Sequence, residues 1–115
     1  MKILFVDNHS DFVRTVRKAF LADHEVTVES TVEGARQAAA AVVFDVAMVD
    51  YDLDDGKGDA FVAWLRENQP NVPIVAVSSH DQGNAALLRA GALTTCAKLD
   101  FRRIGDVLLE VAGGA

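Results

Sequence analysis

Three short runs of hydrophobic residues, each ending at a polar residue, dominate the pattern of the chain. These runs and the polar residues after them are 3–6 with Asp7, 46–49 with Asp50, and 74–77 with Ser78. Uninterrupted apolar runs of this length are typical of strands buried on both faces of a parallel sheet. Residues 25–29 alternate polar and apolar positions and predict a more exposed strand, and residues 93–98 indicate a weaker fifth strand.

Helical patterns separate these strands. Ser10 can cap the first helix, and Ser30 and Glu33 have the spacing of a capping box before the alanine-rich second helix. Asp59 can open the third helix, which must end before Pro70. We predict five helices, at residues 10–20, 30–41, 59–69, 82–90 and 101–111.

The alternation of strands and helices predicts an α/β fold. Right-handed crossovers give a parallel five-stranded sheet covered on both faces, a flavodoxin-like (βα)5 doubly wound sandwich with strand order 2-1-3-4-5. Such folds bind ligands outside the carboxyl ends of the strands, at the switch point between the first and third. We expect one domain over residues 1–112 and a frayed tail at 113–115.

Composition narrows the class of protein without changing the fold. Of the 115 residues, 50% are hydrophobic and 24% charged, and no apolar run approaches the roughly 20 residues that a membrane-spanning helix needs. The single cysteine, Cys96, permits no internal disulfide and is expected to be buried, in keeping with the cytoplasm. A net charge of −6 argues against direct binding to nucleic acid.

Four polar side chains should meet at the carboxyl edge of this sheet. Asp7, Asp50 and Ser78 follow three of the strands, and Lys98 ends the fifth. Neighbouring carboxylates repel one another, so this edge favours a divalent cation with oxygen ligands, such as Mg²⁺. A carboxylate can also act as a nucleophile and form an acyl phosphate where metal, lysine and hydroxyl groups meet the phosphoryl charge.

These residues and their spacing resemble the receiver domains of two-component response regulators, exemplified by the chemotaxis response regulator. The resemblance spans nearly the whole chain, and its order and separations are more specific than any one piece. The matching segments are Leu4-Phe5-Val6-Asp7-Asn8, Met48-Val49-Asp50, Gly58, residues 73–79 (Pro-Ile-Val-Ala-Val-Ser-Ser), Ala90-Gly91-Ala92 and Ala97-Lys98.

The resemblance implies a phosphoacceptor signalling domain rather than an enzyme with turnover. A histidine kinase or phosphotransfer protein would phosphorylate Asp50, Ser78 would bond the phosphoryl oxygens, and Lys98 would pair with them. A downstream protein would bind the surface formed by the fourth helix, fifth strand and fifth helix, and a homodimer is also possible. The implied Mg²⁺ ligands are Asp7, Asn8, Asp50 and the backbone carbonyl of Asp52.

Several positions depart from the family pattern. Asn8 replaces the second acid of the usual pair, so Mg²⁺ affinity should fall unless Asp52 or Asp54 compensates. Thr95 stands where the family usually carries an aromatic residue that reports phosphorylation. Prolines usual in the family are replaced by Asp54 and Leu99.

Other functions compatible with parts of the sequence stay open. A degenerate receiver would bind a partner without phosphorylation. A phosphatase of the haloacid-dehalogenase type would use Asp50 and Asp52 as its aspartate pair. An EF-hand loop after Asp50 lacks the required glycine and glutamate positions, and a flavin site lacks a phosphate-cradling loop. The histidines have no metal-binding spacing and are expected at the surface: His9, His24 and His80.

Overall fold

The computed structural model describes residues 1–113, and the sheet has the predicted strand order. Five parallel strands lie in the order β2-β1-β3-β6-β7, which is 2-1-3-4-5 for the five predicted strands. They are β1 (Lys2–Val6), β2 (Glu25–Glu29), β3 (Val46–Val49), β6 (Ile74–Ala76) and β7 (Thr94–Thr95). The flavodoxin-like α/β prediction is therefore confirmed.

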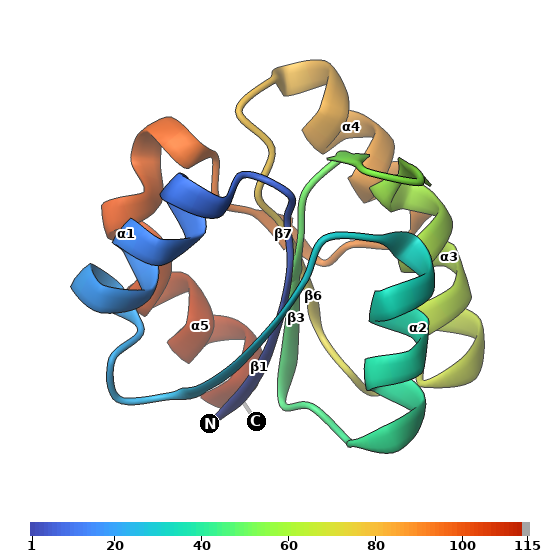
Figure 1. Ribbon diagram of the computed structural model, residues 1–115, viewed down its shortest axis with the longest axis horizontal. Coiled ribbons are helices and arrows are strands. Elements are labelled where there is room, and N and C mark those ends of the chain that lie inside the picture. Colours follow the sequence, from blue (N-terminus) through green and yellow to red (C-terminus); the bar gives the residue numbers. More distant parts are fainter. Residues whose placement is uncertain (114–115) are drawn as a thin grey trace.

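Helices cover both faces of the sheet (Figure 1). One face carries α1 and α5, and the other carries α2, α3 and α4. The bounds are α1 (Ser10–Phe20), α2 (Val32–Ala41), α3 (Gly58–Asn68), α4 (Asp81–Ala90) and α5 (Ile104–Gly113), with a 3-10 helix, η1 (Lys98–Arg103), before α5. None of these helices is long and apolar enough to cross a bilayer. The predicted tail at 113–115 lies outside the described residues, except for Gly113.

The buried runs of β1 and β3 divide their side chains between two hydrophobic cores. Leu4 and Val49 face the core under α2, α3 and α4, whereas Phe5 and Met48 face the core under α1 and α5. Successive side chains of a strand point to opposite faces, which is why these runs contain no polar residue. Cys96 is buried in the second core, as predicted.

The structure corrects several local predictions. Helix α1 has His9 at its N-cap position with no side-chain cap, and the α2 cap is Thr31, whose hydroxyl accepts from Gly34 N, rather than Ser30. Only Thr94 and Thr95 of the predicted fifth strand pair with β6. A short antiparallel hairpin, β4 (Asp52–Leu53) and β5 (Gly56–Lys57), was not predicted.

Candidate functional site

The fold brings two buried carboxylates to the carboxyl edge of the sheet, at the predicted switch point. Asp7 directly follows β1 and Asp50 directly follows β3, and they are only 2% and 3% exposed. Their backbone N–H groups extend the strand ladders, Asp7 N donating to Glu29 O (2.9 Å) and Asp50 N to Val6 O (2.8 Å). Because β1 and β3 are adjacent, the two side chains lie beside each other.

Lys98 binds both carboxylates at once. Its ammonium Nζ lies 3.0 Å from Asp7 Oδ2 and 3.1 Å from Asp50 Oδ2, and the Lys98 side chain is only 10% exposed. The ammonium also lies over the ring of Phe12, 4.7 Å from its centroid. Three of the four polar residues predicted for this edge therefore form one ionic cluster, with two formal negative charges and one positive.

His9 joins this cluster, which sequence reasoning did not anticipate. Its Nδ1 lies 2.8 Å from Lys98 Nζ, 3.1 Å from Asp7 Oδ1 and 3.3 Å from Asp50 Oδ2. The side chain is 57% exposed, so the surface location predicted for it is confirmed. Its ring is held by a turn in which His9 N donates to Asp7 Oδ1 (2.8 Å). An aspartate two residues before a histidine at a strand end is the signal that could have revealed it.

Asp52 and Asp54 make hydrogen bonds outside the cluster formed by Asp7, Asp50 and Lys98. The Asn8 amide Nδ2 donates to Asp54 Oδ1 (3.1 Å), and the Asp52 carboxylate binds Lys57 Nζ across the β4–β5 hairpin. The Asn8 carbonyl Oδ1 is buried and receives no hydrogen bond within residues 1–113. Asn8 thus offers one uncommitted oxygen beside Asp7, and the role of the Asp52 backbone carbonyl stays a prediction.

Ser78 lies at the same edge but is engaged elsewhere. Its Oγ accepts from His80 N (3.1 Å), and no hydrogen bond joins it to either carboxylate in the described part of the chain. The buried Asn84 side chain, on α4, fixes this loop: Oδ1 accepts from Ser78 N (2.9 Å) and Nδ2 donates to Ser78 O (3.0 Å). Asn84 is a second residue that the sequence pattern did not single out.

Gly58 has a physical reason for its place eight residues after Asp50. It begins α3, and its Cα lies so close to strand β3 that a Cβ at this position would overlap the backbone carbonyl oxygen of Asp50 and approach Val49 Cγ1 to 3.1 Å. A glycine allows this close approach of two backbone segments. The N-terminus of α3 is thereby packed against the backbone of Asp50.

The β4–β5 hairpin shifts the ionisation of its own charged groups. Hydrogen bonding from Lys57 lowers the pKa of the Asp52 carboxyl, and the same contact raises the pKa of Lys57. The Asp55 carboxylate accepts from Val32 N (2.7 Å) and Glu33 N (3.2 Å), and these bonds lower its pKa. Asp55 therefore caps α2 from a different segment of the chain.

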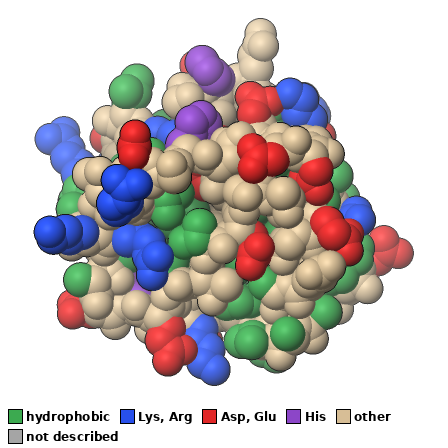
Figure 2. Space-filling model, in the orientation of Figure 1, with side chains coloured by type: hydrophobic (Ala, Val, Ile, Leu, Met, Phe, Trp, Pro, Cys, Tyr) green, Lys and Arg blue, Asp and Glu red, His purple; other side chains and the backbone are tan. Residues whose placement is uncertain are grey.

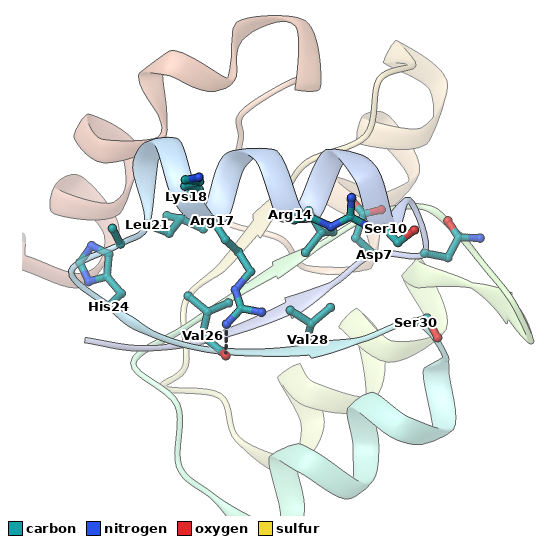
Figure 3. Close-up of a pocket in the computed structure, with 13 residues that line it drawn as sticks. Asp7, Ser10, Arg14, Arg17, Lys18, Leu21, His24, Val26, Val28 and Ser30 are labelled. Carbon is teal, nitrogen blue, oxygen red and sulfur yellow. Dashed lines mark hydrogen bonds between the residues drawn. The ribbon is translucent and has the colours of Figure 1, made fainter.

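A groove of about 620 Å³ runs from Asp7 and Asn8 along α1 and the edge strand β2. Figure 2 shows apolar surface in this hollow with basic side chains on its α1 side. The cations come from one face of the helix, at Arg14, Arg17 and Lys18. In Figure 3, Arg17 reaches across the groove to Val26 O, at 3.5 Å.

The donor atoms of the carboxylate cluster fit a divalent cation. Asp7 and Asp50 supply buried carboxylates, and Asp7 Oδ2, although 3.0 Å from the Lys98 ammonium, receives no hydrogen bond among residues 1–113. The unpartnered Asn8 Oδ1 adds a neutral oxygen. Oxygen donors of this kind suit Mg²⁺, which needs only one or two carboxylates besides water.

A doubly wound parallel sheet, with two acids at its switch point that share one lysine, defines a flavodoxin-like domain whose candidate site lies at the carboxyl edge of the sheet. The family model described as "Response regulator receiver domain" matches residues 3–104. The chain therefore belongs to the receiver domains of two-component response regulators.

The similarity of the chain to an individual response regulator supports this family assignment. The chain is 27% identical over 112 residues to the response regulator protein PilR of Pseudomonas aeruginosa, an alignment that covers 93% of this chain and 25% of PilR. The chain thus spans about a quarter of the length of the curated relative it matches.

Solved structures show the same fold. A two-component response regulator from Clostridium difficile superposes with a TM-score of 0.84 at 19% identity, covering 96% of this chain and 94% of that one. The response regulator protein TrrA of Thermotoga maritima, in complex with Mg(2+)-BeF, gives a TM-score of 0.86 at 14% identity, covering 96% and 97%.

Proposed function

We propose that the carboxylate of Asp50 accepts a phosphoryl group from a phosphorylated histidine of a kinase or phosphotransfer protein, in the cytoplasm. The supporting observation is the Lys98 ammonium between the two buried carboxylates, 3.0 Å from Asp7 and 3.1 Å from Asp50. A buried carboxylate with an adjacent cation is suited to stoichiometric transfer to an acyl phosphate.

In this step a carboxylate oxygen of Asp50 attacks phosphorus, an O–P bond forms and the donor's N–P bond breaks. The electron pair stays on the donor nitrogen. Tyr51 N donates to Asp50 Oδ1 (2.8 Å), and Lys98 Nζ lies 3.1 Å from Oδ2, so both oxygens are oriented by the protein. Lys98 offsets the charge that arrives with the phosphoryl group.

The residues proposed to hold Mg²⁺ are Asp7, Asn8, Asp50 and the backbone carbonyl of Asp52. When bound, the ion would neutralise the phosphoryl oxygens. Ser78 Oγ accepts from His80 N, which leaves its hydroxyl hydrogen free to donate to those oxygens. This hydrogen bond is part of the proposal and would couple phosphorylation to the start of α4 through the contact with His80 N.

The proposed output surface is the face formed by α4, β7 and α5. Large hydrophobic side chains are exposed there, with Leu93 62% and Leu109 66% accessible. Exposed large apolar side chains on these elements are available to contact a partner protein. Thr95 on β7 is half-buried and carries no aromatic ring, so the readout must come from backbone or helix movement rather than a rotating aromatic side chain.

The proposal is tested by incubating the protein with Mg²⁺ and acetyl phosphate and measuring intact mass. We expect one phosphoryl group in the wild-type chain and none in Asp50→Asn. Phosphorylation of the variant would remove Asp50 from its role. No added mass in the wild type at saturating Mg²⁺ would favour a receiver that binds its partner without phosphorylation.

A further inference from the structure

The position of His9 carries an inference that rests on the proposed function and concerns its metal. We infer that His9 Nδ1 is a third ligand beside Asp7 and Asp50, and that this site binds a first-row transition metal ion such as Co²⁺ more tightly than Mg²⁺. These three side chains offer ligand atoms that all lie within 4.8 Å of one another.

The distances from His9 to the two carboxylates match those between ligands of one metal ion. His9 Nδ1 is 3.1 Å from Asp7 Oδ1 and 3.3 Å from Asp50 Oδ2. Ligands bound about 2.1 Å from a metal lie about 3.0 Å apart at a right angle and about 3.4 Å apart at the tetrahedral angle. Both separations fall within this interval, so the cluster could take an ion with small side-chain movements.

His9 Nδ1 faces the cluster, and in one tautomer its lone pair points there. A lysine ammonium can only donate hydrogen bonds, so the 2.8 Å contact with Lys98 Nζ is a hydrogen bond in the tautomer whose Nδ1 accepts, and in that tautomer Nδ1 cannot donate to the carboxylates of Asp7 and Asp50. An imidazole nitrogen binds a metal through this same lone pair. The ammonium now lies where lone pairs from His9, Asp7 and Asp50 converge, so a bound ion would displace it from that point.

The donor set explains the expected metal preference. Asn8 brings no negative charge to the site, which weakens the attraction for Mg²⁺, an ion that prefers oxygen ligands. Imidazole instead favours ions later in the first transition row, whose affinity for a mixed nitrogen and oxygen site exceeds that of the harder ions. The 57% exposed side chain of His9 leaves a path from solvent for the ion.

The test is calorimetric titration with Co²⁺ and with Mg²⁺, together with the visible d–d absorbance of bound Co²⁺. We expect wild-type protein to bind Co²⁺ more tightly than Mg²⁺. His9→Asn should weaken Co²⁺ by at least about tenfold, a loss that even outer-shell partners of metal ligands produce, and should change Mg²⁺ little. His9→Asp should raise Mg²⁺ affinity and weaken Co²⁺.

Two other histidines provide matched controls. His24→Asn removes a separate nitrogen pair, because His24 Nδ1 lies 3.1 Å from the amino terminus, and His80→Asn removes another exposed histidine at the carboxyl edge. Neither should alter the affinity or absorbance of Co²⁺ at the Asp50-dependent site. Equal Co²⁺ affinity and an unchanged spectrum in His9→Asn would overturn the assignment.

The phosphorylation experiment separates this inference from the function on which it rests. If Asp50 takes no phosphoryl group in either metal while Co²⁺ binding still depends on His9, the metal assignment stands and the proposed function fails. If Asp50 is phosphorylated in Mg²⁺ and Co²⁺ binding is independent of His9, the function stands and the metal assignment fails.

Discussion

Removing the charge of Lys98 should destabilise the fold through its two carboxylate partners. Lys98→Met keeps the length of the side chain but leaves Asp7 and Asp50, which are 2% and 3% exposed, without a counter-ion. Both contacts near 3 Å are strongly attractive at the low dielectric constant of a buried site, and the desolvation of the ammonium offsets most of that attraction. We therefore expect a net loss of about 3 kcal/mol, within the range for one partner of a buried pair.

Urea unfolding followed by far-ultraviolet circular dichroism measures this loss, and for a chain of this size it corresponds to a fall in Tm of about 12 °C. Lys57→Met is the matched control, because Lys57 and its partner Asp52 are both 56% exposed and screened by solvent. Adding Asp7→Asn to Lys98→Met should recover part of the stability, since it removes one of the uncompensated charges. A Lys98→Met protein as stable as the Lys57→Met control would refute the electrostatic reasoning.

Two further substitutions test the packing and the capping described above. Gly58→Ala places a Cβ against the backbone carbonyl of Asp50 and should cost about 2–3 kcal/mol, whereas Gly105→Ala, with nothing within 4 Å, should stabilise α5 by up to about 1 kcal/mol. Urea midpoints compare the two variants, and equal effects would contradict the close approach. Asp55→Asn should lower the free energy of unfolding at neutral pH. Because the folded pKa of Asp55 is lowered, the stabilisation by its charge is complete above the ordinary carboxyl pKa and disappears as pH falls through the folded value. A stability difference between wild type and variant that does not change with pH would exclude this charge effect.

The fold could be predicted because the sequence pattern indicates both which strands are buried and where they end. The runs that became β1 and β3 are apolar at every position, as a strand between two cores requires, and each is followed by an aspartate. The β4–β5 hairpin was missed for the opposite reason. Each of its strands has only two residues, and the segment from Asp52 to Lys57 reads as an acidic loop rather than as an alternating pattern.

The sequence predicts the site residues whose position follows directly from the end of a strand. Asp7 and Asp50 follow from topology, since adjacent parallel strands end at one edge of the sheet. The contacts of His9 depend on the turn after β1, and those of Asn84 depend on the direction of one side chain near the start of α4. Neither feature produces a periodic pattern in the sequence. Side-chain rotamers and turn geometry decide such contacts, whereas hydrophobic patterning determines only which element a residue occupies.

Asn8, which stands where the family usually has an acid, changes the net charge of the whole cluster. With two acids and Lys98, the cluster holds one formal negative charge while His9 is neutral, so the ammonium can satisfy most of it without a metal. A third acid would add repulsion that only a divalent ion could offset, which would couple metal binding tightly to stability. In this chain the metal must instead compete with Lys98, and a nitrogen ligand from His9 would add affinity without adding charge. A site of this composition can remain folded and ion-paired without a metal ion.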